Sequence, residues 1–172
     1  VHDESTRELK LLVDRREDLI SERTRQINRL RWHLHELDPE FVVPTKSLRT
    51  RAQRERVTAW LIGRDGLVAE IAQDILTDIT AVSVKADALE KRIIALVEAR
   101  YPHLLAIPGC GPLAAAKIAG ETANANRFRS EACFAMNAGV APLPVWSGNT
   151  RGRVRMSRTG NRQLNAALHR IA

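Results

Sequence analysis

Two long stretches of the sequence repeat apolar residues at alternating intervals of three and four positions, the spacing of a coiled-coil seam. The first covers residues 5–37 and the second covers residues 67–100. Each predicts one helix, and the first would be about 50 Å long at 1.5 Å per residue. The seam positions are Leu9, Val13, Arg16, Ile20, Arg23, Ile27, Leu30, Leu34 and Leu37, followed by Val68, Ile71, Ile75, Ile79, Val82, Ala86, Leu89, Ile93 and Leu96.

Two arginines, Arg16 and Arg23, interrupt the first seam. Such side chains either extend their charged heads to solvent or pair with acids across an interface. We expect the two helices to form an antiparallel pair, whose seams close on each other or on a second copy of the chain. Because an extended arm with exposed apolar stripes usually dimerises, we favour a homodimer formed through residues 5–37 and 67–100.

A shorter, basic helix is expected between the two seams. The prolines of "DPEFVVPT" end the first long helix, and Ser47 is a plausible N-cap for a helix that runs to about Ile62. Its stretch "LRTRAQRER" is expected to contact phosphates. After the "GRDG" turn, Asp65 is a possible cap for the next helix. Residues 1–100 would thus form a coiled-coil arm for dimerisation and nucleic-acid contact.

Residues 101–172 are expected to form a compact helical domain. The segment "HLLAIPGCGPLAAAKIAGET" predicts a helix, a tight turn and an alanine-rich helix. The segment "RFRSEACFAMNAGVA" predicts another helix, with Ser130 or Arg129 at its start and Gly139 past its end. "GNRQLNAALHRIA" predicts a last helix that Asn161 would cap. Because no strand signal rises above the short segment "VRM", the predicted fold class is all-α.

The turn in "LLAIPGCGPLAAAKI" resembles the helix-hairpin-helix element of DNA-handling proteins. Gly109 and Gly111 would turn the backbone with positive φ and let a phosphate approach closely. Pro112 suits the first turn of the following helix, whose free N–H groups attract an anion. The alternative is a plain αα-hairpin closed by a glycine turn.

The net charge of +7 favours a polyanionic partner, nucleic acid before a membrane surface. No apolar run reaches the ~18 residues of a membrane span, and no signal-peptide pattern begins the chain, so we expect a cytoplasmic protein without a membrane partner. Cys110 and Cys133 lie far apart and outside any Cys/His cluster. They predict no metal site, and two free, buried thiols in a reducing compartment.

Residues 141–161, "APLPVWSGNTRGRVRMSRTGN", combine a Ser-Gly pair with a row of arginines, and no Asp or Glu follows Glu131. Prolines and Gly148 would expose the Ser147 hydroxyl, and the arginines could hold a phosphate. Because no neighbouring His or Asp completes a hydrolase triad, attack on a phosphodiester fits better than attack on an ester. The alternative is that Ser147 is an ordinary loop residue. The positive charges after Glu131 are Arg151, Arg153, Arg155, Arg158, Arg162 and Arg170.

Residues 105–168, "LAIPGCGPLAAAKIAGE…RFRSEACFAMNAGVAPLP…SG…GRVRMSRTGNRQLNAAL", resemble the C-terminal domain of the insertion-sequence one-ten transposases, relatives of the Piv invertase. Residues 5–37 are similar to the long helix that follows the nuclease-like domain of that family. The resemblance implies that Ser147 corresponds to a serine that becomes covalently joined to DNA. Small departures are Asn149 where a second Gly is frequent and Arg158 where Lys is frequent.

The resemblance also implies a RuvC-like domain, whose four acidic residues bind Mg²⁺, and a guide RNA. That domain would lie before Val1, so we expect no cofactor in this chain and no activity from it alone. The sequence therefore predicts the C-terminal part of a bacterial, nucleoid-associated DNA transposase or recombinase. Ser147 would be the nucleophile, and the DNA-binding residues would be Gly109, Gly111, Arg151, Arg153, Arg155, Arg158, Asn161 and Arg162.

Two other classes of function compete with the transposase. One is a non-catalytic module that binds branched DNA or RNA with the turn and the arginine loop. The other is a purely structural dimerisation domain, against which the charge of +7 and the acid-free C-terminal stretch argue. Replacing Ser147 by Ala distinguishes the first from a transposase, since a binding module would keep its full activity.

Overall fold

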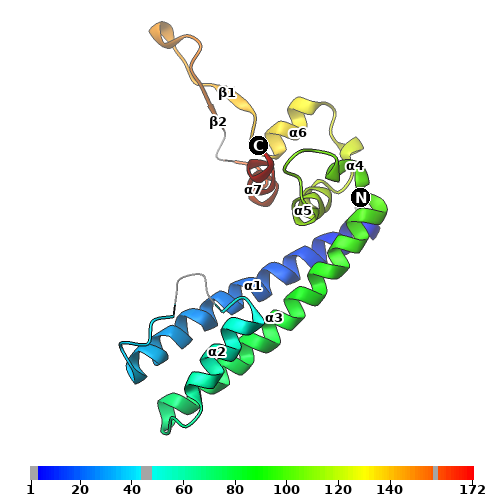
Figure 1. Ribbon diagram of the computed structural model, residues 1–172. Helices are drawn as coiled ribbons and strands as arrows, with labels where there is room; N and C mark the ends of the chain where they lie inside the picture. Colours follow the sequence, from blue (N-terminus) through cyan, green and yellow to red (C-terminus); the bar gives the residue numbers. More distant parts are fainter. Residues whose placement is uncertain (1–3, 44–47, 157–158) are drawn as a thin grey trace. The chain divides into compact units, whose positions relative to one another are not determined.

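The computed structural model describes residues 4–43, 48–156 and 159–172 (Figure 1). Within these residues nearly all regular structure is helical, which confirms the all-α class, and the exceptions are two three-residue strands. The elements are α1 (Glu4–Leu37), α2 (Arg51–Leu61), α3 (Leu67–Arg100), α4 (Pro102–Leu105), α5 (Pro112–Thr122), α6 (Glu131–Asn137), β1 (Pro142–Pro144), β2 (Val154–Met156) and α7 (Arg162–Ile171), with short 3₁₀ turns at Ala125–Arg127 and Gly148–Thr150.

The chain divides into two compact units. The first comprises the chain up to Val13 together with Lys91–Ala172, and the second comprises Asp14–Glu90. The beginning of α1 and the end of α3 thus belong to the first unit, and the rest of both helices belongs to the second.

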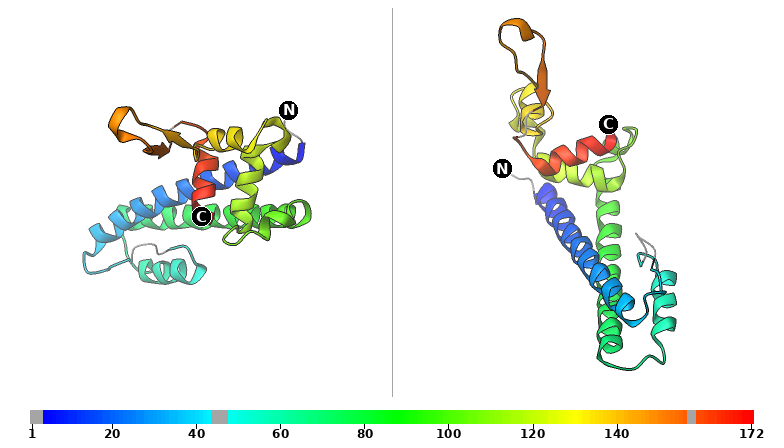
Figure 2. Two further views of the ribbon diagram at one scale, coloured as in Figure 1. Left: turned by 90° about the horizontal axis from the view of Figure 1, so that it is seen from above. Right: turned by 90° about the vertical axis from the view of Figure 1, so that its left-hand side faces the viewer.

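In the second unit α1 and α3 run antiparallel and α2 packs beside them (Figure 1, Figure 2). Apolar side chains of α1, α2 and α3, together with Leu48 before α2, pack into one continuous core from which water is excluded. The fully or nearly buried members are Ile27, Leu30, Leu34, Leu48, Val57, Leu61, Ala72, Leu76 and Ile79.

Helix α2 begins later than the sequence predicts. Thr50 is its N-cap, its hydroxyl accepts from the Gln53 N–H, and the Gln53 side chain accepts from the Thr50 N–H in return. This capping box satisfies free N–H groups at both positions, so it fixes the helix start at Arg51. The predicted cap, Ser47, lies outside the described residues.

The seam of α1 is confirmed at most positions, whereas the seam of α3 is confirmed only in part, at Ile79, Ala86 and Ile93. Leu9, Leu30 and Leu34 are buried as expected. On α3, the predicted Val68 and Ile71 are only half-buried. Small residues take part in the contact line beside large apolar ones, because small side chains let two helices approach closely. The buried residues of α3 are Ala69, Ala72, Leu76, Ile79, Ser83, Ala86, Ile93 and Val97.

The two seam arginines are accommodated within the second unit. Arg16 Nη2 lies 2.7 Å from Glu90 Oε2, which joins α1 to α3. The pKa of Arg23 is lowered because its guanidinium is partly buried and neighbouring arginines, among them Arg49, add positive charge, although Asp87 opposes the shift. The seams therefore close on each other within one chain, and the homodimer stays a prediction.

In the first unit, α5 packs against α7, and its alanines are buried. Gly120 of α5 lies against the backbone of Lys10 on α1, where an added Cβ would be 3.0 Å from the Lys10 Cα. Only glycine permits this close approach without a shift of the backbone. The buried side chains of α5 and α7 include Ala115, Ala116, Ile118, Ala119, Leu164 and Ala167.

Candidate nucleic-acid interface

The predicted serine loop is a β-hairpin (Figure 1). β1 and β2 pair antiparallel, with Leu143 opposite Arg155, and the Val145 N–H donates to the Arg153 carbonyl at 2.9 Å. The segment between the strands forms the tip, and Ser147 is exposed there. The exposure of Ser147 agrees with the expectation for this residue, whereas a pairing of two strands was not predicted, since "VRM" gave only a short strand signal.

The base of the hairpin is fastened to the end of α6. Gly139 and Gly160 have φ of +68° and +105°, a conformation that favours glycine, and their backbones touch. The Asn161 N–H donates to the Asn137 carbonyl at 2.6 Å. Asn165 Nδ2 donates to the Ala138 carbonyl at 3.0 Å. The position of Gly139 just past the helix end agrees with the prediction.

Asn161 caps α7 as expected, since its Oδ1 accepts from the N–H groups of Gln163 and Leu164 at 3.0 Å. Its Nδ2 donates to Glu121 Oε2 at 2.6 Å, and Lys10 Nζ lies 2.5 Å from the other oxygen of Glu121. Both ends of the Asn161 side chain therefore have partners in the fold. The predicted contact between Asn161 and DNA stays a prediction.

The Glu121 carboxylate is nearly enclosed by this network, with 7% of its side chain exposed. Burial alone would raise its pKa. The hydrogen bonds from Lys10 and Asn161, together with the charges of Lys10 and Lys117, outweigh burial and hold the pKa of Glu121 below its ordinary value. The carboxylate is thus ionised at neutral pH and ties α1, α5 and α7 together.

The predicted arginines of the hairpin are on its surface. Arg151, Arg153 and Arg155 are exposed, and so is Arg162 at the start of α7. Arg158 lies outside the described residues. Because no Asp or Glu follows Glu131, no neighbouring carboxylate in this part of the sequence offsets these charges. The hairpin is a concentrated site of positive charge, the chemistry that phosphate groups recognise.

The turn at Pro108 is only partly as predicted. Gly109 has φ of +78°, but Gly111 has φ of −72°, so the expected positive φ at Gly111 is wrong. Gly111 is instead the N-cap of α5, in an extended conformation that any residue adopts. The N–H groups of Cys110 and Gly111 donate to carbonyls of Ile107 and Gly109 within the turn.

The close approach at Gly109 is made to the protein itself. An added Cβ there would be 3.2 Å from the Ile171 carbonyl oxygen of α7, so Gly109→Val would disturb packing before it reached a phosphate. The helix before the turn, α4, is a single turn of four residues. The helix-hairpin-helix element and the phosphate contacts of Gly109 and Gly111 stay predictions.

The stretch "LRTRAQRER", which includes the start of α2, offers fewer arginines to a phosphate than its sequence suggests. Arg54 is buried, and its Nη1 donates to the carbonyl oxygens of Leu48 and Arg49 at 3.3 and 2.8 Å. Arg51 Nε lies 2.6 Å from Glu55, whose hydrogen bond and charge raise the pKa of Arg51. Arg54 therefore holds the start of α2 together and is not exposed for a phosphate, whereas the phosphate contact expected of the stretch as a whole stays a prediction.

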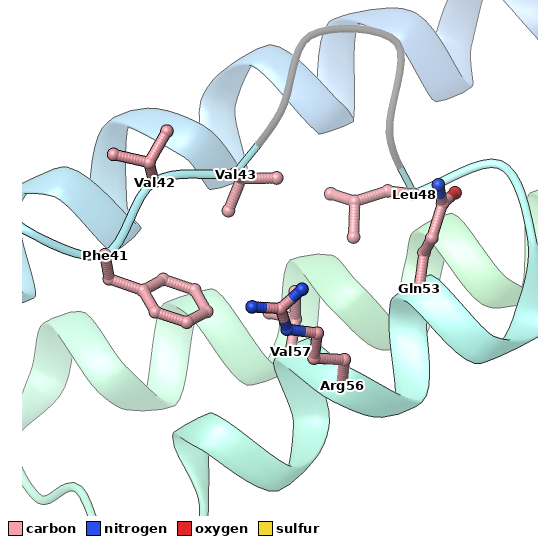
Figure 3. Close-up of a pocket in the computed structure, with 7 residues that line it drawn as sticks. All are labelled: Phe41, Val42, Val43, Leu48, Gln53, Arg56 and Val57. Atoms are coloured by element: carbon pink, nitrogen blue, oxygen red, sulfur yellow. The ribbon is translucent and has the colours of Figure 1, made fainter.

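A small pocket of about 100 Å³ lies between α2 and the segment before it (Figure 3). Among the described residues that line it, most are apolar and Arg56 is the one with a charged side chain. None of the predicted site residues lines it. The lining residues are Phe41, Val42, Val43, Leu48, Gln53, Arg56 and Val57.

The cysteines are both free, as predicted, but only one of them is buried. Burial raises the pKa of Cys110, which keeps its thiol protonated at neutral pH. Cys133 is exposed, so its predicted burial is wrong. Across the described ranges, no three His, Cys, Asp or Glu side chains converge to hold a metal ion. No helix in the described part of the chain is long and apolar enough to cross a membrane.

Fold and charge together define a mostly helical protein with an exposed hairpin that bears Arg151, Arg153 and Arg155. Comparison with known proteins places it: residues 101–172 match the family model described as "Transposase IS116/IS110/IS902 family". The match with this family model and the similarity to curated relatives support a fragment of a transposase of this family. The search of solved structures gave no significant match.

Two curated relatives share more than isolated motifs with the chain. An "Insertion element IS110 uncharacterized 43.6 kDa protein" of Streptomyces coelicolor is 30% identical over 215 aligned positions, which cover 96% of this chain and 52% of the relative. A "Probable family 20 transposase" of Pseudomonas aeruginosa is 27% identical over 103 positions, which cover 59% of this chain and 30% of the relative. The chain therefore spans about half the length of the first relative. The alignment with the second relative covers a smaller share of that protein, 30%.

Sequence reasoning missed the Glu121 network. Glu121, Lys10 and Asn161 lie far apart in the sequence, and no local pattern links them. The available signal was a single acidic residue at the end of an otherwise alanine-rich helix. A buried carboxylate requires partners, and the local sequence offers only Lys117, four residues earlier on the same helix, and neither Lys10 nor Asn161.

Proposed function

We propose that this chain is the DNA-binding and nucleophile-bearing part of a transposase, and that Ser147 attacks a DNA phosphate. The observation that carries this proposal is the position of Ser147, exposed at the tip of a hairpin whose second strand bears Arg155 and is preceded directly by Arg153. The resemblance to the insertion-sequence transposases assigns the nucleophile to the same Ser-Gly pair. Because the chain covers 52% of the first relative, the proposed activity is that of a longer protein.

The proposed step exchanges one ester for another. The Ser147 Oγ forms a bond to phosphorus, and the bond between phosphorus and one sugar oxygen breaks. The proton of the serine hydroxyl is transferred overall to that leaving oxygen. A phosphodiester is thereby replaced by a phosphoserine ester of similar energy, so a second hydroxyl can reverse the exchange and join a new strand.

The arginines of the hairpin would stabilise the charge of the transition state. Arg151 and Arg153 are exposed beside the tip, and no Asp or Glu after Glu131 competes for them. Positive groups placed where negative charge develops are worth most when they are positioned before the reaction. The hairpin supplies no carboxylate base, so these arginines act by binding and by neutralising charge.

The Mg²⁺ that the resemblance implies is not matched by the described residues, since none of their His, Cys, Asp and Glu side chains form a cluster of three. We therefore assign the ion to the RuvC-like domain that the family implies, and no step in this chain is routed through it. The guide RNA and a bacterial cytoplasmic, nucleoid-associated location likewise belong to the proposal.

The proposal is tested by a variant that should still bind DNA but should no longer join strands. In a complete transposase that includes this chain, Ser147→Ala should bind DNA with the wild-type affinity and release no joined strands. Ser147 is exposed, so this change should leave the fold intact. If Ser147→Ala kept full strand-joining activity, the chain would be a non-catalytic binding module, the main alternative.

A further inference from the structure

The two faces of the hairpin differ in chemistry. Side chains alternate across a pair of strands, so positions of equal parity share a face. The pairing of Leu143 with Arg155 and the hydrogen bond from the Val145 N–H to the Arg153 carbonyl place the odd-numbered residues on one face. The even-numbered residues of both strands share the other face.

The even-numbered face is apolar and exposed to solvent. Pro142 and Pro144 of β1 are exposed, and across from them Val154 and Met156 of β2 are 60% and 46% exposed. The same alternation, carried one residue past the last hydrogen bond, adds Trp146, which is 49% exposed. This apolar face therefore ends in an aromatic ring one residue before the proposed nucleophile.

The free edge of β1 is unsuited to pairing with another strand. Because the Val145 N–H points toward β2, the alternate positions 142 and 144 would direct their N–H groups to the outer edge. Both are prolines, which have no N–H to donate. A second copy of the chain, or any other protein, would find no donors at these two positions.

The odd-numbered face complements a polyanion instead. It bears the exposed Arg153 and Arg155 beside the apolar Leu143 and Val145, with Arg151, also exposed, near the tip. Duplex DNA presents rows of phosphates on either side of an apolar stack of bases. Proteins that bend DNA combine the same two elements, arginines for the backbone and an apolar wedge for a base step.

We propose that the hairpin is a wedge for duplex DNA, in which Arg153 and Arg155 bind phosphates while Trp146 presses between two base pairs next to the phosphate that Ser147 reaches. This proposal rests on the proposed function for DNA as the partner, but it does not require Ser147 to be the nucleophile. Unstacking is easiest at flexible pyrimidine–purine steps such as TA. The wedge therefore selects deformable steps rather than a base sequence.

Fluorescence of 2-aminopurine detects such a wedge directly, because the base becomes brighter when it is unstacked. The probe is a short duplex with one TA step, in which 2-aminopurine replaces the adenine of that step. Binding of the 172-residue chain should raise the fluorescence. Trp146→Ala should abolish the rise and weaken binding about tenfold, whereas Trp146→Phe, which keeps an aromatic ring, should retain part of both.

Two control variants separate the wedge from general effects. Trp32 is an exposed tryptophan on α1, away from the hairpin in the sequence, so Trp32→Ala should leave the fluorescence rise unchanged. Arg153→Ala should weaken binding but keep the rise once the DNA is saturated. A duplex with an abasic site at the TA step is already unstacked, so it should bind Trp146→Ala and the wild type with similar affinity.

Several results would overturn the wedge. Wild-type binding to DNA without any rise in fluorescence would do so while leaving the proposed DNA partner intact. An absence of DNA binding would remove both proposals together. If Trp146→Ala instead bound DNA normally and changed the oligomeric state in light scattering, the apolar face would be a protein interface. Tighter binding to an RNA duplex than to the DNA duplex would also contradict it.

Discussion

Asn161 Nδ2 donates a 2.6 Å hydrogen bond to Glu121 Oε2, while Asn161 Oδ1 caps α7. One side chain therefore joins the end of α5 to the start of α7, immediately after the hairpin that carries Ser147. Lys10 holds the second oxygen of Glu121 at 2.5 Å, which brings in the beginning of α1. We infer that this network sets the position of the hairpin base.

Glu121→Gln should destabilise the first unit by about 1–3 kcal/mol at neutral pH, because hydrogen bonds to a charged group are lost. The folded pKa of Glu121 is lowered, so its contribution is complete above the unfolded pKa of about 4.3 and is lost as the pH falls through the folded value. Urea unfolding of both proteins across acidic pH measures this. A stability difference that stayed constant with pH would contradict it.

Gly160→Ala should be more damaging than Gly152→Ala, although both glycines have positive φ. A Cβ on Gly160 would lie 2.7 Å from the Asn137 carbonyl oxygen, whereas a Cβ on Gly152 would have no neighbour within 4 Å. We expect Gly152→Ala to lower the free energy of unfolding by about 1–2 kcal/mol, from the conformational cost alone. Gly160→Ala should lower it by clearly more. Thermal or urea unfolding of the two variants provides the comparison, and equal losses would argue against a rigid hairpin base.

The homodimer predicted for the arm can be tested through the apolar residues that stay exposed on it. Leu11 on α1 and Val84 on α3 are 60% and 62% exposed. If these surfaces associate, light scattering over a concentration series should show a dimer, and Val84→Asp should shift it toward monomer. Val42, which is 76% exposed outside the helices, offers Val42→Asp as a control. A monomer at every concentration would contradict the prediction.

The affinity for DNA should fall steeply with salt and vary little with sequence, apart from the preference for deformable steps. Arg153→Ala should reduce the slope of log affinity against log salt by about one, because one phosphate contact is lost. Arg54→Met should leave the slope unchanged and lower stability, since the Arg54 guanidinium is buried against backbone carbonyls. A wild-type affinity that did not depend on salt would exclude binding through phosphates.

The long helices could be predicted from sequence because their apolar spacing is a local property. Part of the α3 seam, including Ile79 and Ile93, was predicted correctly. Ala69, Ala72 and Ser83 were missed because small side chains look neutral in a pattern of apolar residues, yet they can be buried where helices pack closely. The start of α2 was misplaced because several residues of that segment can cap, and only the reciprocal bond between Thr50 and Gln53 decides between them.

The candidate site was predictable in composition but not in shape. Its serine and arginines stand out in the sequence, since no acidic residue balances them. The strands are three residues long; β1 contains two prolines and gives no strand signal, and β2 gives only the short signal of "VRM". At Gly111 the predicted conformation was wrong because a cap that satisfies α5 needs no positive φ.

The central claim is that Ser147 is the nucleophile, and mapping the covalent adduct tests it most directly. A complete transposase that contains this chain should be trapped on labelled DNA, digested, and analysed by mass spectrometry for the residue that bears the nucleotide. We predict that the nucleotide is attached to Ser147, that Ser147→Ala forms no adduct although it binds DNA, and that Ser157→Ala keeps at least part of the activity. An adduct that persists in Ser147→Ala, or that maps to Ser157, would contradict the claim.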